Sequence, residues 1–520
     1  MLHRAAALPR AFCVSALGLF AAPGVTAQQT AEPAVDRPLS VIDWLGTQDS
    51  LATAQPAPPT EPAVTSSGSI PAVTVEPLGK GRPRQIGLVP ATVTGLPDTL
   101  WFGSDPDTLI KLIESLPDLN LPAAQSLLFT ILLAEAKAPG GNATAGDGLA
   151  LARVSKLLEA GALDPALSLI EQAGVTTSPA HFDLYMRISL LAGTEDRACA
   201  LLGTAPHLSR DYGTRIFCDA RASRWEDAAL TFGAAQALNL MPEAKLALID
   251  RFLHPDVFED ARPLPDPREM DPLSFRLFES IGEPKPTRML PRPYAVADLR
   301  DLAGWKAQLE AAERLTRAGA LPDNRLLGLY TDRDPAASGG VWDRVAALQR
   351  FETALETGSS EAIAKTLPRA WRAMRQAELE VPFATLFADR LAQIELTGTS
   401  ARIARDMGLL SPAYETISTG TSDLLTQIAR GETSGRRPDV PLAAAIFDAF
   451  KDAQAPARLI SGAQNNRLGE TVLKTLALLH EGARGDPGTL RDALTTLRAL
   501  GLEDTARRAA LQVLILERPT

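Results

Sequence analysis

The residue types that carry most enzyme chemistry stand in this chain without the spacing that such chemistry requires. The sequence contains no His-Glu-x-x-His pair, no Gly-x-Ser-x-Gly turn and no phosphate loop ending in Gly-Lys-Ser or Gly-Lys-Thr. His181, His207, His254 and His480 stand singly, and a lone histidine is more often a packing or surface residue than a catalyst. The acidic residues within 256–260 suit a solvated turn better than a cation site. We therefore predict no catalytic residue, no cofactor and no metal ligand.

One loop has residue types suited to binding an anion. Residues 330–342 are polar and small, and they lead into a helix expected to begin near Trp342. Backbone amides at the start of a helix can bind an anion, and the Arg333 side chain can assist. The candidate binding residues are Arg333, Asp334, Ser338, Gly339, Gly340 and Trp342. A plain interhelical loop with a glycine hinge is the alternative that we favour.

Two cysteines are placed to form a disulfide. Cys199 and Cys218 lie in neighbouring predicted helices joined by a turn at 205–207, and antiparallel helices would bring them close. Paired cysteines are common in an oxidising compartment. A bond between them would stabilise the fold by about 3 kcal/mol through loop entropy. Two buried free thiols are the alternative. A metal site is not expected, because no histidine or second cysteine pair stands at ligand spacing.

The first 27 residues predict a signal peptide. Arg4 and Arg10 give a basic start, an apolar stretch follows at 11–22, and Val25-Thr26-Ala27 matches a small-x-small cleavage pattern. The apolar stretch is about a dozen residues, short of the ~20 that span a bilayer, so an uncleaved anchor is the weaker alternative. Because no later stretch is long enough either, we expect an exported chain with no transmembrane segment.

Composition favours packed helices over sheet. Aromatic residues make up only 5% of the chain, and strands draw on aromatic and β-branched residues. A hydrophobic fraction of 45% can bury a core, and 520 residues suffice for two or more domains. The formal net charge of -10 becomes more negative when a signal peptide containing Arg4 and Arg10 is removed, so nucleic acid is not an expected partner.

Residues 28–100 predict a disordered tether. The proline-rich run at 55–62 and the Ser/Gly stretch at 66–69 cannot bury much apolar surface. A short apolar island at 39–45 interrupts the tether, and its residues Val41, Trp44 and Leu45 would share one helical face. We expect this island to dock onto the chain's own body, with docking onto a partner as the alternative.

The rest of the sequence predicts short helices joined by a recurring turn. Asp-Pro or Ser-Pro pairs suited to helix starts recur at 105–106, 164–165, 271–272, 411–412 and 486–487. A second pattern, in which a small residue is followed by a capping or acidic residue and then Ala, begins at Gly161, Gly193, Ser223, Gly408 and Gly501, with a degenerate copy at Gly319. The first three copies are about 31 residues apart, close to the tetratricopeptide period, although that consensus is incomplete here.

These patterns predict an all-α fold, a helix-turn-helix repeat array that forms a tetratricopeptide-like solenoid or superhelix behind the tether. The many prolines between 256 and 294 divide the array into a first helical segment, 101–255, and a second, 295–520. A proline-rich connection need not be flexible, and this one can lie pinned across the array.

Several phrases taken together resemble a family of uncharacterised exported helical proteins from alphaproteobacteria. They lie at 37–45, 94–97, 194–199, 338–344 and 410–415. Some members carry the automatic label antifreeze glycopeptide polyprotein or antifreeze protein, and the resemblance implies no known activity. The tandem Ala-Ala-Thr units of antifreeze glycopeptides and a regular Thr-x-Thr ladder are both missing from this chain.

The sequence as a whole favours a helical-repeat interaction or scaffold protein in the periplasm of a Gram-negative bacterium. Its expected partner is a protein or peptide of the cell envelope, because helical arrays present extended binding faces. The alternative is a peptidoglycan-associated enzyme or enzyme accessory with a helical superstructure, although no catalytic glutamate stands in a recognisable motif. Ice binding, as the family label suggests, is a distant third.

Overall fold

A computed structural model describes residues 85–300, 302–417 and 423–516. The described residues form 25 α-helices and one small two-stranded sheet, which confirms the all-α prediction. None of these helices is both long and apolar enough to cross a membrane. The signal peptide predicted at 1–27 and the docking island Val41, Trp44 and Leu45 lie outside the described residues.

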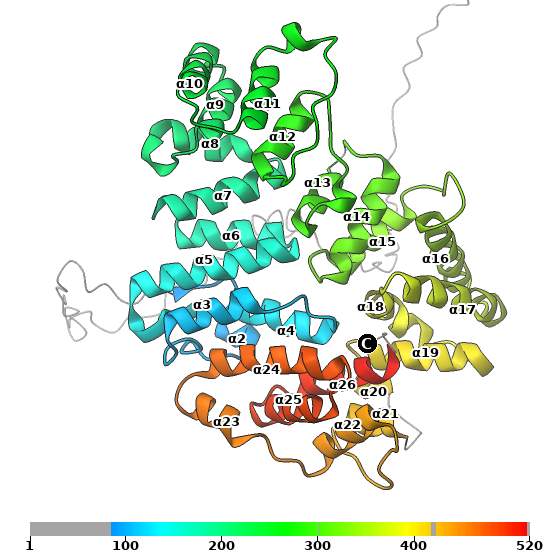
Figure 1. The fold of residues 1–520 in the computed structure, drawn as a ribbon. Helices are drawn as coiled ribbons and strands as arrows, with labels where there is room; N and C mark the ends of the chain where they lie inside the picture. The colour runs from blue at the N-terminus through cyan, green and yellow to red at the C-terminus, as the bar shows by residue number, and fades with distance from the viewer. Residues whose placement is uncertain (1–84, 301, 418–422, 517–520) are drawn as a thin grey trace, which may run out of the picture. The chain divides into compact units, whose positions relative to one another are not determined.

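The first group of helices follows the chain from α2 to α11. Their bounds are α2 Ala91–Thr94, α3 Pro106–Ser115, α4 Pro122–Leu133, α5 Ala143–Ala160, α6 Leu163–Ala173, α7 Pro179–Ala192, α8 Glu195–Thr204, α9 Tyr212–Arg221, α10 Trp225–Ala237 and α11 Glu243–Leu253. From α4 onward each helix packs on the next one along the chain, and Figure 1 shows α5, α6 and α7 lying side by side.

The proline-rich stretch after α11 is ordered and contains one helix, α12 Pro272–Ser280. Short 3₁₀ turns occur in the remainder, at Pro255–Phe258, Thr287–Met289 and Arg292–Tyr294. The next helices are α13 Ala295–Asp298, α14 Trp305–Arg317, α15 Asp323–Thr331, α16 Val341–Glu356, α17 Ser360–Gln376, α18 Glu380–Leu391, α19 Gly398–Leu410 and α20 Tyr414–Ile417. The last are α21 Leu424–Arg430, α22 Pro441–Lys451, α23 Ala457–Gln464, α24 Leu468–Ala483, α25 Pro487–Ala499 and α26 Glu503–Ile515.

The folded body begins before residue 101, where the predicted tether was to end. Strand β1, Gln85–Ile86, pairs antiparallel with β2, Ala136–Lys137. Leu100 and Trp101 are both fully buried. Residues 85–100 therefore belong to the packed body. Their few apolar side chains pack into a core, although the neighbouring proline-rich sequence predicts a tether.

A buried arginine fixes this N-terminal corner. Arg153 on α5 is 2% exposed and donates hydrogen bonds to the carbonyl oxygens of Leu132, Ala134 and Ile86, at 2.6, 2.9 and 2.9 Å. Burial lowers the pKa of Arg153 to about 10, which leaves the guanidinium charged at neutral pH. The cation satisfies the free carbonyls where α4 ends and ties strand β1 to that helix.

Three of the five predicted Asp-Pro or Ser-Pro starts are true helix caps. Asp105, Asp271 and Asp486 accept hydrogen bonds from backbone N–H groups in the first turns of α3, α12 and α25. Asp164 instead lies within the first turn of α6, and Ser411 lies at the end of α19, where its hydroxyl donates to a carbonyl oxygen. The motif finds helix ends but does not always tell a start from a stop.

Most copies of the recurring turn end a helix in the left-handed backbone region. Gly161, Gly193, Ser223 and Gly501 have φ values of 84°, 76°, 60° and 78°, whereas Gly408 lies inside α19. A left-handed residue after a helix lets the chain turn back without a steric penalty when it is glycine. The alanines that follow these four turns, Ala166, Ala198, Ala228 and Ala506, are each 0% exposed, as close helix packing requires.

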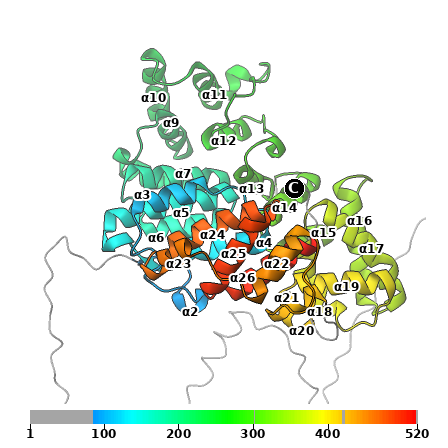
Figure 2. The same cartoon turned by 60° about the horizontal axis from the view of Figure 1, so that its bottom comes forward.

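The last helices of the chain complete the core around the first. Helices α24 and α26 contact α4, and α24 also contacts α3, as Figure 2 allows the reader to follow. Gln512 on α26 accepts a 2.9 Å hydrogen bond from the backbone N–H of Ala123, 389 residues away. Gly469 on α24 donates to the carbonyl oxygen of Leu100 at 2.9 Å. The hydrophobic core therefore does not follow the predicted division at 256–294.

Candidate functional site

A cleft of about 970 Å³ is lined by both predicted helical segments and by the connection that joins them. The first segment contributes the α3–α4 loop, α4, α5 and α7, and the second contributes α14, α16 and the turn before α18. Between them in sequence, residues 288–294 of the connection line the same cleft. The proline-rich connection thus forms part of the wall of a binding-sized space.

Charged side chains dominate the lining of this cleft. Its arginines are Arg187, Arg288, Arg292, Arg314, Arg317 and Arg344. Its acidic residues are Asp118, Glu159, Glu310, Glu313 and Glu378. What the cleft can bind depends on which of these charges already neutralise one another.

One ion pair holds the connection against the first segment. Both terminal nitrogens of Arg292 donate to the Asp118 carboxylate, at 2.9 and 2.6 Å, across 174 residues of sequence. The hydrogen bonds from Arg292 lower the pKa of Asp118 below its usual value, against the opposing effect of burial. A bidentate arginine–carboxylate pair fixes geometry as well as charge. The wall formed by the connection is therefore set in place by the cleft's own residues.

A second ion pair braces the opposite wall. Glu313 on α14 is 4% exposed, and it accepts hydrogen bonds from Nε and Nη2 of Arg344, at 2.7 and 2.6 Å, and from the Tyr330 hydroxyl. Burial first, and then the Glu313 charge, raise the pKa of Tyr330. Burial opposes the charge of Arg344, but its hydrogen bonds to Glu313 raise its pKa nonetheless. Three helices, α14, α15 and α16, are joined at this point.

Arg314 makes no ion pair with the described residues and donates instead to backbone carbonyls of the connection. Its Nη1 lies 3.1 Å from the Thr287 oxygen and its Nη2 lies 2.5 Å from the Leu290 oxygen. Burial lowers the pKa of Arg314, and the neighbouring charges of Arg292 and Arg317 lower it further. Like charges are therefore crowded together on this wall of the cleft.

Four of the six arginines form no ion pair with any residue that the structure describes. Within the described ranges, Arg187, Arg288, Arg314 and Arg317 make no ion pair, and Arg317 donates only to a backbone carbonyl at 3.3 Å. Two of the acidic residues, Glu159 and Glu310, face lysines of their own helices, at 3.0 and 3.8 Å. A guanidinium presents a fork of donors that fits carboxylate and phosphate oxygens. The cleft is therefore equipped to bind an anion.

The candidate binding loop lies between α15 and α16, apart from the charged cleft. Gly339 and Gly340 take φ values of 92° and 57°, and the Gly339 amide donates to the Asp343 carboxylate at 3.0 Å. The Trp342 ring packs on Trp305 with centroids 5.1 Å apart. Because the Gly339 amide already donates to Asp343, a side chain in the first turn of α16, fewer backbone donors remain there for a ligand. Arg333, Asp334 and Ser338 border shallow open depressions beside this loop.

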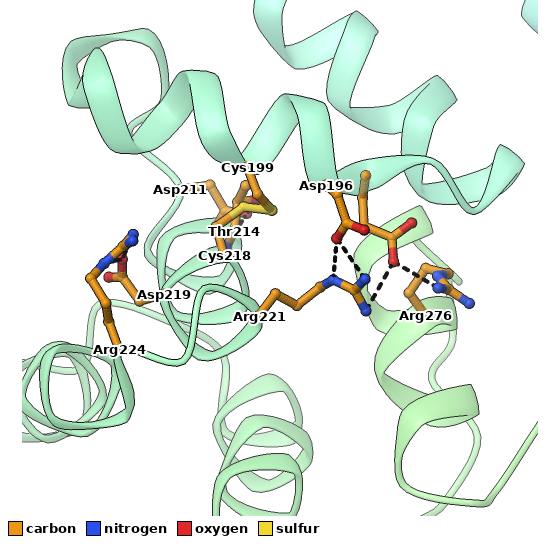
Figure 3. The surroundings of a disulfide bond; sticks show 10 residues. Asp196, Cys199, Asp211, Thr214, Cys218, Asp219, Arg221, Arg224 and Arg276 are labelled. Atoms are coloured by element: carbon orange, nitrogen blue, oxygen red, sulfur yellow. Dashed lines mark hydrogen bonds and ion pairs between the residues drawn. A yellow bond between two sulfur atoms is a disulfide. The ribbon is translucent and has the colours of Figure 1, made fainter.

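The structure confirms the predicted disulfide between Cys199 on α8 and Cys218 on α9. Their Cα atoms are 4.9 Å apart, within the ordinary range for a disulfide. Figure 3 shows the bond beside a group of ion pairs, in which Arg221 reaches Asp196 at 2.6 Å. Arg276 on α12 reaches the buried Glu195 at 2.7 Å. The covalent bond and these pairs together fix α8, α9 and α12.

Sequence reasoning missed the arginines of the cleft. They come from α7, the connection, α14 and α16, and although Arg314 and Arg317 are neighbours on α14, no single motif along the chain links the six. Among the described residues, no three His, Cys, Asp or Glu side chains gather closely enough to hold a metal ion. The acidic turn near residue 256 thus offers no such cluster.

No family model, curated protein or solved structure matches this chain. The geometry of the cleft is therefore what supports a functional proposal.

Proposed function

We propose that this chain is an exported helical-repeat interaction protein of the cell envelope, and that it holds its partner in the arginine-lined cleft. The observation that carries the proposal is the set of four cleft arginines that form no ion pair with the described residues, in a space of about 970 Å³. Ligand sites commonly have volumes of about 300–1,000 Å³ and a few convergent polar groups.

The walls of the cleft are fixed without a partner. The Arg292–Asp118 pair holds the connection, and the Arg344–Glu313 pair holds α14 against α16. Rigid walls lower the entropic cost of binding, because fewer side chains have to be ordered when a ligand arrives. This arrangement supports a binding role.

The turns of the array support the repeat part of the proposal. Four copies of the recurring turn end helices in the left-handed region and are followed by fully buried alanines. Stacked helical hairpins built in this way present long surfaces to proteins and peptides. The predicted signal peptide supports export, and the resemblance to exported proteins of alphaproteobacteria supports location in the periplasm of a Gram-negative bacterium.

Photo-cross-linking in cells tests this proposal. A photoreactive amino acid at Ser155, an exposed residue that lines the cleft, is expected to capture a partner from the cell envelope. The same group at Lys365, whose side chain is 73% exposed on α17 and does not line the cleft, is the matched control. Failure to capture anything at Ser155 in cells that make the protein well, or equal capture at both positions, would overturn the proposal.

A peptidoglycan-associated role is the second candidate, and the same arginines favour it. Peptidoglycan stem peptides carry carboxylates, which are suitable ligands for guanidinium groups. Co-sedimentation of the purified mature protein with isolated sacculi, and release of muropeptides from them, would test this role. Sedimentation without release would indicate an accessory that binds the wall. If the protein neither sediments with the sacculi nor releases muropeptides, the second candidate is wrong.

A further inference from the structure

We propose that the cleft recognises oxyanions, and that Arg187, Arg288, Arg314 and Arg317 together bind an acidic peptide segment that carries several carboxylates. This inference rests on the proposed function, because it names the chemistry of the partner that the cleft holds. Its first support is the separate origin of the arginines. Arg187 comes from α7, Arg288 from the connection, and the other two from α14.

Three of the cleft's acidic residues already pair with other side chains in the described part of the chain. Asp118 is taken by both terminal nitrogens of Arg292. Glu313 is buried and taken by Arg344 and Tyr330. Glu159 pairs with Lys156 at 3.0 Å. Within the described ranges none of the four arginines belongs to an ion pair, so each keeps guanidinium donors for an anion from outside.

Crowding of like charge makes an anion favourable at one wall. Arg314 lies close enough to Arg292 and Arg317 for their charges to lower its pKa, after the effect of burial. Only Arg292 of these three has a carboxylate partner within the described part of the chain. A bound carboxylate would remove the mutual repulsion of the cations, which is strong where water is partly excluded.

The arrangement favours several carboxylates over a single small anion. Arg187 and Arg288 are exposed, whereas Arg314 is half-buried, so the donors reach from the mouth of the cleft to its wall. Their origin in three elements suits an extended ligand with charges at intervals. The cleft lining carries six arginines against five acidic residues, whereas the chain as a whole has a net charge of -10, so arginine is concentrated here in an acidic protein. Local charge of this kind selects and orients an anionic partner.

Fluorescence anisotropy with the mature full-length protein tests the inference. The probe is a labelled peptide of alternating Glu and Gly, and its Gln–Gly analogue is the uncharged control. Tripolyphosphate is the competitor that represents phosphate oxyanions. We expect the Glu peptide alone to bind, with an affinity that falls as salt rises.

The double variant Arg187→Gln/Arg317→Gln removes two exposed donors that make no ion pair in the described ranges, so the fold should persist. We expect it to weaken binding by at least about tenfold, since one charged hydrogen bond contributes roughly that factor. Arg436→Gln, at an 87% exposed side chain outside the cleft, is the matched control and should bind as the wild type does. Circular dichroism checks that each variant is folded.

The outcomes separate the inference from the proposed function. Suppose that the wild type binds tripolyphosphate but not the Glu peptide, and that the double variant binds neither. The oxyanion site would then stand, but its ligand would be phosphorylated and not an acidic peptide. If neither anion binds, or if the double variant binds both as the wild type does, the inference is wrong. If Ser155 then still captures a partner in cells, the proposed function stands alone. Glu-peptide binding without any capture at Ser155 would overturn the proposed function and keep the site.

Discussion

Among the residues that line the cleft, we expect Glu313 to contribute most to stability through its buried carboxylate. Replacing it by Gln keeps the shape of the side chain and removes its charge. Its side chain is 5% exposed, and its two oxygens receive three hydrogen bonds, two from Arg344 and one from Tyr330. In the Glu313→Gln variant, Arg344 would remain partly buried beside a neutral amide that can accept only some of those bonds.

The expected loss follows from the burial of the two partners. Removing one member of a fully buried ion pair costs about 3–5 kcal/mol, because the other charge is left without compensation. Arg344 keeps 19% of its side chain exposed, so solvent screens part of that cost. We therefore expect Glu313→Gln to lower the free energy of unfolding by about 3 kcal/mol.

The same helix supplies the control. Glu310 also lines the cleft, but its partner Lys306 is 3.8 Å away and the two side chains are 36% and 60% exposed. Exposed pairs of this kind contribute at most about 0.5 kcal/mol, so Glu310→Gln should be nearly neutral. Urea unfolding followed by circular dichroism, with hydrogen exchange to localise the change to α14–α16, compares the two. Equal shifts in the two variants would refute the reasoning from burial.

Three further predictions concern the rest of the body. Replacing Cys199 and Cys218 by Ser should destabilise the α8–α9 hairpin by about 3 kcal/mol, seen as faster hydrogen exchange in those helices, because the bond closes a loop with a sequence separation of 19. Burial, and then the charge of Asp271, raise the pKa of Tyr294 to about 12. The stability that this shift contributes is present below about pH 10 and should be lost between about pH 10 and 12, because the unfolded chain loses the proton first. Unfolding curves at each pH should show a smaller loss in Tyr294→Phe. Gly469→Ala should shift the thermal midpoint downward, because the added methyl carbon would lie 2.4 Å from the Trp101 ring.

Local chemistry made much of the fold predictable. Helix caps such as Asp105 act within one turn, so the sequence contains the whole interaction. The Cys199–Cys218 pair was predictable because one short hairpin joins the two residues. The turns at Gly161 and Gly193 were predictable because glycine adopts the left-handed region without strain.

Interactions between distant residues were not predictable in this way. Trp101 is buried largely because α24, far along the chain, packs beside it, so the surrounding sequence gave no sign that folding starts before residue 101. The Arg292–Asp118 pair spans 174 residues and joins two segments that each look like connections. Arg187 and Arg317 likewise fall on ordinary helical positions, where an arginine of a cleft resembles any solvated side chain.

The contact between α26 and α4 can form only late in the synthesis of the chain. The backbone N–H of Ala123 finds the side chain of Gln512 only after 389 further residues have been made. At about 5–20 residues per second, synthesis of that stretch takes roughly 20 to 80 seconds. Until α24 and α26 have been made, the faces of α3 and α4 that contact those two helices are covered only by elements made earlier, such as α5. An exported chain therefore has to be kept from aggregating until α26 is present, because the packing of α3 and α4 is incomplete before then.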